Sequence, residues 1–453
     1  MKEKLRGSFG SKLGIILATA GSAVGLGNIW RFPYMTGEHG GAIFILVYVV
    51  FVLLLGIPCM MNEFIIGRRG AANPVRSYKK LSNNTPWKYI GIIGVITGFL
   101  IMSYYAVVSG WCLQYTFGSL MGEFHGDKEA IAQYFHDFST DLWRPAMWTI
   151  VFIFLSHFIV LKGIENGIEK ASKIFMPTLF VFLLIIVVCS CMLPGAVDGI
   201  RFLLKPDFSK LNGETVLGAM GQSFYSLSVG LGCLCTYASY YSRDTNLTKS
   251  AVQISVVDSL IAVLAGMMIF TSAFSVGVHP DSGPSLIFIT LPNVFLQAFS
   301  DAPAVGMVMS VMFYALLSLA ALTTLISLHE MSTSFIHEEF NMSRKRASLL
   351  VAVACCVLGV FCSLSLGAVD GLSLFGLPLF GLFDFFTGQI MLPLGGLLTC
   401  LFIGWYVPKR TVKEEFTNYG TLRGTLFTTY LFLIRFVCPL SILTVFLHQL
   451  GVF

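Results

Sequence analysis

The sequence predicts an all-α polytopic membrane protein with eleven membrane-spanning helices, two of them broken in mid-membrane. Of its 453 residues, 55% are hydrophobic and only 12% are charged, whereas about a quarter of the residues in a soluble domain are charged. Apolar runs of about 20 residues, the length that crosses a bilayer, recur along the chain. No soluble segment separates these runs, so we expect one transmembrane domain over residues 1–453.

Eleven apolar runs are long enough to span. In chain order they cover residues 13–36, 42–66, 88–121, 146–161, 174–194, 215–240, 251–278, 304–336, 347–368, 375–407 and 425–450. A further piece, 286–299, is too short to cross, and Pro284 and Pro292 interrupt it, so we expect a re-entrant or surface hairpin there. All eleven cysteines lie in or beside apolar runs, which argues against a disulfide framework.

Basic residues gather in alternate loops, at residues 2–12, 68–80, 344–346 and 409–413. The positive-inside rule therefore predicts a cytoplasmic N-terminus, and an odd number of spans puts the C-terminus on the extracytoplasmic side. The loop 195–214 is an exception, because it carries three basic residues on the predicted outside. The basic start of the chain shows no small-residue cleavage site, so we expect no removable signal peptide.

The first span contains residues that do not suit a membrane helix. The segment TAGSAVGLGNIWRFPY at 19–34 includes Gly21, Gly25, Gly27, Asn28 and Arg31. Unpaired backbone groups are costly in hydrocarbon, so an unwound segment persists only where it lines a cavity or binds something. A charged residue within a span also indicates function. A small-residue packing seam is the alternative, but it would explain the glycines and neither Asn28 nor Arg31.

A second interruption follows five spans later. The sixth span, QSFYSLSVGLGCLCTYASYYSRD at 222–244, places Ser226, Ser228, Gly230 and Gly232 in mid-membrane. Broken helices at matching positions of two five-span halves are typical of an inverted repeat with a binding site at the bilayer midplane. We therefore expect a first repeat over 13–194, an inverted second repeat over 215–407 and an extra span at 425–450.

Six motifs connect the chain to a known family. They are GSAVGLGNIWRFPY at 21–34, GGAIFILVYVV at 40–50, GIPCMMNEFIIGRRG at 56–70, SYYAVVSGW at 103–111, GQSFYSLSVGLGCLCTYASY at 221–240 and SLAALTTLISLHE at 318–330. Over essentially its whole length the chain resembles the neurotransmitter:sodium symporter family, particularly the bacterial amino-acid transporters of the leucine-transporter type. The resemblance implies the leucine-transporter fold and sodium-coupled import of an amino acid by alternating access.

The resemblance also implies a substrate site between the two broken helices. The amides of Leu26 and Gly27 and the Tyr105 hydroxyl would hold the substrate carboxylate, because free N–H groups at a helix start attract anions. The ammonium would meet the carbonyls of Ala23, Tyr225 and Ser226 and the Ser228 hydroxyl. Without the resemblance, Tyr105 would be interpreted as a core or interfacial aromatic residue.

The matched side-chain pocket is apolar. Its residues are Ile101, Tyr225, Ser228, Leu231, Thr324, Leu325 and Leu328. It contains no full charge, so we expect a neutral and hydrophobic or aromatic substrate. Relatives that carry amines place an aspartate at the position of Gly25, and glycine there favours an amino acid.

Two sodium sites follow from matched positions. The first would consist of the Ala23 carbonyl, Asn28, Ser226, Asp258 and the substrate carboxylate. The second would consist of the carbonyls of Gly21, Val24 and Ala320 and the hydroxyls of Thr323 and Thr324. From the sequence alone, the preferred interpretation of the two threonines is that they bond back to carbonyls of their own helix.

Asp258 departs from the better-known bacterial relative, which has asparagine there. Chloride-dependent members carry a serine near the position matched to Ala262, which has no hydroxyl. A carboxylate at Asp258 would supply the compensating negative charge, so we expect transport without a chloride requirement. Pairing of Asp258 with a basic residue is the alternative.

Two charge pairs match the family's gates. Arg31 and Asp384 would form the outer gate above Tyr225. Arg6 and Glu338 would form the inner gate, where Phe9 replaces the usual tryptophan. Either pair could instead be an inert surface ion pair.

Other functional classes have less support. We find no nucleophile, metal cluster or cofactor motif of an enzyme, and expect sodium, the substrate and the lipid bilayer as partners, without nucleic acid. A channel and a solute sensor remain alternatives, while the preferred amino acid, sodium stoichiometry, proton countertransport and oligomeric state stay open.

Overall fold

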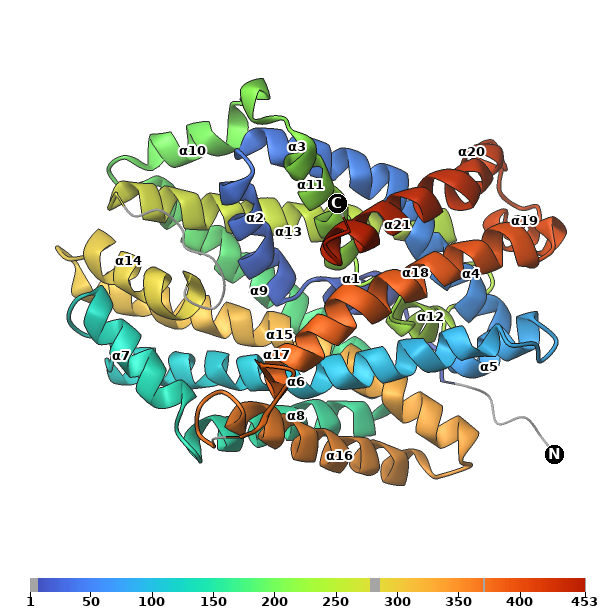
Figure 1. Ribbon diagram of the computed structural model, residues 1–453, viewed down its shortest axis with the longest axis horizontal. Helices are drawn as coiled ribbons and strands as arrows, with labels where there is room; N and C mark the ends of the chain where they lie inside the picture. Colours follow the sequence, from blue (N-terminus) through green and yellow to red (C-terminus); the bar gives the residue numbers. More distant parts are fainter. Residues whose placement is uncertain (1–6, 278–285, 370, 453) are drawn as a thin grey trace.

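The computed structural model describes residues 7–277, 286–369 and 371–452 and shows a protein built of packed helices (Figure 1). The strands in these residues are β1 (Ser373–Leu374) and β2 (Leu377–Pro378), which pair antiparallel with Ser373 opposite Pro378. The all-α prediction is therefore confirmed.

The N-terminal part of the chain contains four long helical spans after the broken first one. Its elements are α1 (Lys12–Ala23), η1 (Gly27–Arg31), α2 (Phe32–Glu38), α3 (Ala42–Phe51), η2 (Val52–Gly56), α4 (Ile57–Gly70), α5 (Pro74–Leu81), α6 (Lys88–Met121), α7 (Lys128–Ser139), α8 (Arg144–Leu161), η3 (Ile164–Glu169) and α9 (Lys170–Cys191).

The remainder starts with a connecting helix, followed by two helices that cover the predicted sixth span. Its elements are α10 (Ala196–Leu204), η4 (Phe208–Lys210), α11 (Gly213–Ser226), α12 (Cys233–Ala238), α13 (Leu247–Ser275), η5 (Leu286–Thr290), α14 (Leu291–Ala298), α15 (Pro303–Glu339), α16 (Arg344–Leu364), α17 (Leu379–Asp384), η6 (Phe385–Met391), α18 (Leu392–Leu401), η7 (Phe402–Tyr406), α19 (Lys409–Phe416), α20 (Phe427–Phe432), η8 (Leu433–Val437) and α21 (Cys438–Gln449).

Within the described residues, nine helices are long and apolar enough to cross a membrane. The pair formed by α1 with η1 and α2 bends by 57° at its break and makes a tenth span. Helices α11 and α12, of 14 and 6 residues, lie where another broken span was predicted. The predicted total of eleven spans requires α11 and α12 to cross the membrane as one broken span, and it stays a prediction.

The predicted span boundaries differ most from the helix boundaries at the start of the fifth span. The fifth span begins at Ile164 instead of 174, because the charged residues of η3 and early α9 hid its start. One of them, Glu169, is buried and accepts hydrogen bonds from the Gly10 amide at 2.6 Å and the Ser11 hydroxyl at 2.7 Å. The tenth span begins at Leu379 instead of 375, because the β1–β2 hairpin occupies the residues before it.

The hairpin predicted at 286–299 is also wrong. The segment forms one short helix, η5 followed by α14, that packs against α15. Pro292 is the second residue of α14, which directly follows the π-helical η5, so the change of helix type coincides with the residue that lacks an N–H. Phe288 and Phe295 are buried, and the Phe295 ring lies 5.5 Å from the Phe313 ring between centroids. Pro284 lies outside the described residues.

Helices α6 and α15 form the centre of the molecule and lie side by side along its length (Figure 1). Small residues allow the close approach, since a Cβ added at Gly98 would lie 2.1 Å from the Met331 methyl carbon. Both broken spans pack near the middle of this pair, which therefore forms one wall of the candidate site.

Candidate functional site

The first break separates α1 from η1 at residues 24–26. Val24 has an extended backbone (φ −69°, ψ 112°), so the helix hydrogen bonds stop there. The Leu26 N–H donates to the Tyr105 hydroxyl of α6 at 3.1 Å, and the Gly25 N–H donates to the Asn28 side-chain oxygen at 3.0 Å. A Cβ at Gly25 would lie 2.7 Å from the Thr324 hydroxyl oxygen, so only glycine fits there without a shift.

The second break separates α11 from α12 at residues 227–232. Ser228, Gly230 and Gly232 have positive φ values of 51°, 92° and 84°, which interrupt the helix between α11 and α12. The Gly230 and Cys235 N–H groups donate to the carboxylate of Glu63 on α4 at 2.6 and 3.1 Å. The break is therefore held open by a carboxylate that is only 1% exposed.

Glu63 was missed by the sequence analysis. The sequence did contain a signal for it, because Glu63 is a charged residue inside the predicted span 42–66. A charged residue within a span indicates function, as was argued for Arg31. Its partners are backbone amides of a distant segment, which no motif names. A buried carboxylate satisfied by such donors contributes strong charge-assisted hydrogen bonds.

A cavity of about 60 Å³ lies between the two breaks, with α6 and α15 as its walls. It is lined by Ser22, Ala23, Gly25, Leu26, Gly27, Ile101, Tyr105, Tyr225, Ser226, Ser228, Leu231, Cys233, Thr324, Ser327, Leu328 and Leu392. The structure thus brings together every residue of the predicted substrate site except Leu325, which is fully buried and does not line the cavity. Ser327 was missed although it lies one helical turn after Thr324.

Four polar side chains meet beside the first break. The Asn28 side-chain amide donates to Asp258 Oδ1 at 2.7 Å and to the Ser226 hydroxyl at 3.1 Å. Ser226 donates to Asp258 Oδ2 at 2.7 Å, and the Tyr48 hydroxyl lies 3.4 Å from the same oxygen. Asp258 is completely buried and forms no ion pair in the described part of the chain. Its pairing with a basic residue, the alternative left open by the sequence, is therefore wrong.

The residues predicted for the second sodium also meet. The Thr324 hydroxyl donates to the Val24 carbonyl at 3.1 Å and to the Ala320 carbonyl at 3.3 Å, while Thr323 donates to Ala320 at 2.9 Å. A Cβ at Gly21 would lie 3.1 Å from the Thr323 side chain. The threonines do bond back to their own helix, and Thr324 additionally reaches the broken α1.

A larger cavity of about 540 Å³ lies above the first one, and Leu26, Gly27, Tyr105 and Tyr225 border both. Arg31 and Asp384 line it without forming an ion pair, and the Arg31 guanidinium lies 4.2 Å from the centre of the Tyr225 ring. The predicted outer gate residues therefore share one vestibule.

On the opposite side, Glu338 accepts hydrogen bonds from the backbone and side chain of Asn73 at 2.8 and 2.9 Å. Arg6, its predicted partner, lies outside the described residues. Phe9 packs against the rings of Tyr237, Tyr240 and Tyr241, with centroids 6.0 to 6.3 Å away.

Comparison with known proteins assigns the chain to a family. The model of the sodium:neurotransmitter symporter family matches residues 6–128 and 131–453. The chain belongs to this family. It is 36% identical to YhdH of Bacillus subtilis, an uncharacterized sodium-dependent transporter, over 100% of this chain and 99% of that one. An uncharacterized sodium-dependent transporter of Haemophilus influenzae is 34% identical, over 99% of both chains.

Among solved structures, this symporter resembles MhsT in complex with L-phenylalanine. The TM-score is 0.88 at 40% identity, over 98% of this chain and 100% of the other. The symporter therefore has the leucine-transporter fold, is a multi-pass membrane protein and couples transport to sodium. It is a transporter and not an enzyme, as the sequence predicted.

Proposed function

We propose that this symporter imports a neutral hydrophobic or aromatic amino acid together with sodium. One observation carries the proposal. The cavity between the two breaks is lined by residues of both interrupted helices together with Ile101, Leu231 and Leu328, and no charged side chain lines it. MhsT, which is 40% identical, was solved with L-phenylalanine bound, and this supports a substrate of the same class.

The broken first helix offers donors for a carboxylate. The Tyr105 hydroxyl accepts the Leu26 N–H, so its own hydrogen stays available for another acceptor. A substrate carboxylate at this position would replace Tyr105 as the acceptor of the Leu26 N–H and would also receive hydrogen bonds from the Gly27 N–H and the Tyr105 hydroxyl, at the start of the half-helix. The ammonium would meet the carbonyls of Ala23, Tyr225 and Ser226 and the hydroxyl of Ser228.

The two polar clusters are the proposed sodium sites. Asp258, Ser226, Asn28 and the Ala23 carbonyl provide oxygens for the first ion, which requires Asn28 to turn its side-chain oxygen toward Asp258. Gly21, Val24, Ala320, Thr323 and Thr324 provide five oxygens for the second. Hard cations such as sodium are bound by oxygen ligands of this kind in proteins.

Transport without chloride follows from the same cluster. The Asp258 carboxylate already accepts the Ser226 hydroxyl at 2.7 Å, and Tyr48 lies 3.4 Å from it. A fixed negative charge at Asp258 would compensate the sodium charge in place of a mobile anion.

Alternating access would move spans 1, 2, 6 and 7 against spans 3, 4, 5, 8, 9 and 10. Residues 13–194 and 215–407 would be the two inverted repeats, with the N-terminus in the cytoplasm. Arg31 and Asp384 would pair when the vestibule closes over Tyr225, and Arg6 would pair with Glu338 on the inner side. A pair that forms in only one state biases the equilibrium toward that state.

Competition for uptake tests the substrate class. In proteoliposomes with an inward sodium gradient, unlabelled leucine, tyrosine and tryptophan should each suppress uptake of labelled phenylalanine. Glutamate and lysine should not, because the cavity has no partner for a buried charge. Suppression by glutamate or lysine, with none by the apolar amino acids, would contradict the proposed substrate.

A further inference from the structure

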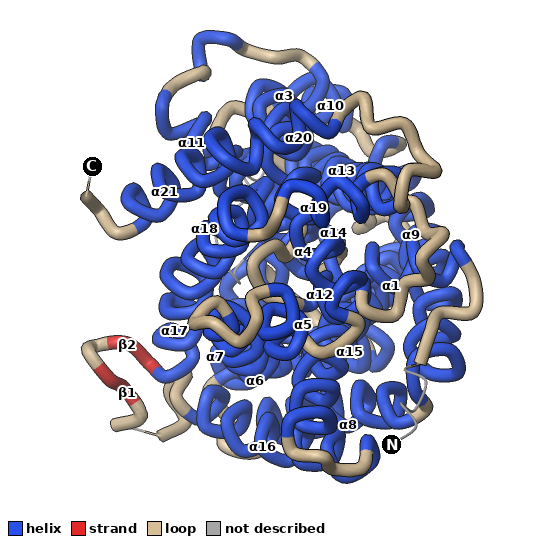
Figure 2. The backbone as a smooth tube through the Cα atoms, turned by 90° about the vertical axis from the view of Figure 1, so that its right-hand side faces the viewer, coloured by secondary structure: helices blue, strands red, loops and turns tan. Residues whose placement is uncertain are grey.

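A groove of about 510 Å³ lies at the end of the molecule where α13 and α20 begin. One wall is the start of α13, and the other is the segment 416–426 that joins α19 to α20. Figure 2 looks onto this end and shows α13, α19 and α20 close together. The lining residues are Asn246, Thr248, Lys249, Val252, Gln253, Phe416, Leu422, Arg423, Thr425 and Leu426.

The polar part of the groove is cationic. Lys249 comes from one wall and Arg423 from the other, and both side chains are exposed. Neither forms an ion pair with any residue in the described ranges, and no aspartate or glutamate is among the lining residues. Two uncompensated cations that face one groove attract an anion, and the guanidinium fork of Arg423 matches phosphate geometry.

The rest of the groove is apolar and exposed. Val252, in the second turn of α13, is 40% exposed, and Leu426, directly before α20, is 61% exposed. Phe416 below them is buried, with its ring 5.5 Å from Phe427 and 5.2 Å from Tyr430 between centroids. A free anion would leave this apolar surface uncovered, whereas a lipid would cover it with the first carbons of its acyl chains.

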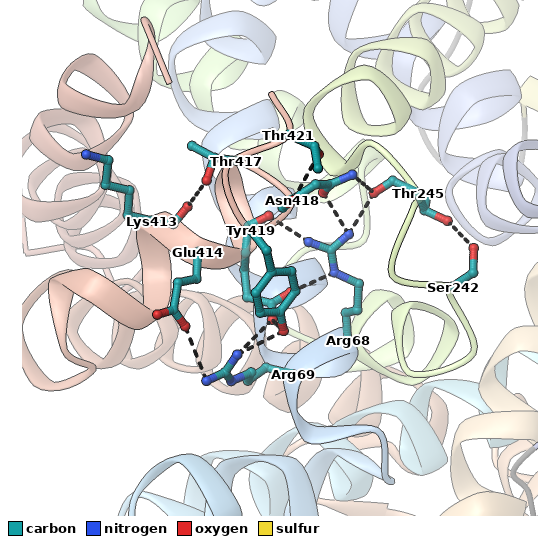
Figure 3. A network of polar contacts seen from close by, with 11 residues as sticks. Arg68, Arg69, Ser242, Thr245, Lys413, Glu414, Thr417, Asn418, Tyr419 and Thr421 are labelled. Carbon is teal, nitrogen blue, oxygen red and sulfur yellow. Dashed lines mark hydrogen bonds and ion pairs between the residues drawn. The ribbon is translucent and has the colours of Figure 1, made fainter. Parts of the chain in front are cut away.

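Both walls are anchored to the same buried arginine (Figure 3). Arg68 of α4 pairs with Glu415 at 2.7 Å and donates to the carbonyl of Thr245 at 2.6 Å. The Asn418 side chain also donates to the Thr245 carbonyl, at 3.0 Å. Thr245 directly precedes the start of one wall and Asn418 lies in the other, so the groove is preformed.

We propose that this groove binds the headgroup of an anionic phospholipid. Lys249 and Arg423 contact the phosphate, and Val252 and Leu426 contact the glycerol end of the acyl chains. The position of the groove supports a lipid as the source of the phosphate, because both walls lead directly into helices that span the bilayer. The Arg68 contacts connect the site to the end of the second span.

Lipid binding to the purified full-length protein in detergent tests the proposal. Native mass spectrometry would measure the dissociation constant of the first adduct with phosphatidylglycerol and with phosphatidylcholine. We expect about thirtyfold tighter binding of phosphatidylglycerol, because each of two cations near a membrane surface contributes about a factor of five. The variant Lys249→Gln/Arg423→Gln should lose this preference.

The matched control is Lys409→Gln/Lys413→Gln, which removes the same charge from an exposed face of α19. It should keep the preference of the wild type, and equal melting temperatures would show that both variants are folded. Three results would overturn the proposal: no preference in the wild type, equal loss in both variants, or displacement of the lipid by an equal concentration of inorganic phosphate.

Discussion

Replacement of Asp258 by asparagine should raise the sodium concentration for half-maximal uptake by about a hundredfold. Asp258 is completely buried and is the one charged side chain that the protein contributes to the proposed first sodium site. Two unit charges 4 Å apart attract by about 4 kcal/mol at an effective dielectric constant of about 20. The remaining ligands recover part of this energy, so a loss of about 2.7 kcal/mol, or a hundredfold, is expected. This sodium concentration is obtained by measuring the uptake of labelled phenylalanine at a series of sodium concentrations.

The matched control is Asp198→Asn, because Asp198 is an exposed residue of α10 that lies 3.5 Å from Arg201. Its sodium dependence should equal that of the wild type. Wild-type uptake at fixed sodium should also stay constant when gluconate replaces chloride. An unchanged sodium dependence in Asp258→Asn, or a steep chloride dependence in the wild type, would contradict the role given to this carboxylate.

Tyr105→Phe should raise the amino-acid concentration for half-maximal uptake by about thirtyfold. The substitution keeps the ring but removes the hydroxyl, which leaves the Leu26 N–H without its partner and removes one donor to the substrate carboxylate. A hydrogen bond to a charged group contributes about 1.5–3 kcal/mol, which corresponds to about ten- to a hundredfold in affinity. The amino-acid concentration for half-maximal uptake is obtained from initial rates of labelled phenylalanine uptake at saturating sodium.

Tyr104→Phe is the control, since it removes a hydroxyl from the neighbouring residue of α6. The Tyr104 hydroxyl lies 3.4 Å from that of Thr387 and does not line the small cavity. We expect at most a twofold change. A larger effect of Tyr104→Phe than of Tyr105→Phe would place the substrate in the outer vestibule instead of between the breaks.

Much of the architecture follows from local sequence. Both breaks were predicted because glycine and polar side chains inside an apolar run leave backbone groups without helix partners. Gly25 shows why the residue type is needed, since a side chain there would collide with Thr324 and Tyr105. The substrate and sodium residues came from matched motifs, and the structure brings together all of those in the described residues except Leu325.

The features that the sequence did not predict depend on contacts between segments that are distant in the chain. Glu63 stabilises the second break through amides 167 and 172 residues away, and periodicity cannot predict such a pairing. The start of the fifth span was missed because Glu169 is charged yet buried against Gly10 and Ser11. The segment 286–298 resembled a hairpin because Pro292, which the structure places within a helix directly after η5, cannot be distinguished by sequence from a proline in a bend.

Uptake of labelled phenylalanine into proteoliposomes tests the central claim most directly. The wild type should accumulate the amino acid above its external concentration when an inward sodium gradient is present and should only equilibrate it without one. Asn28→Ala should abolish the accumulation, because Asn28 connects the first break to Ser226 and Asp258. Flux that needs no sodium and stops at equal concentrations, or accumulation that persists in Asn28→Ala, would contradict a sodium-coupled amino-acid symporter with this site.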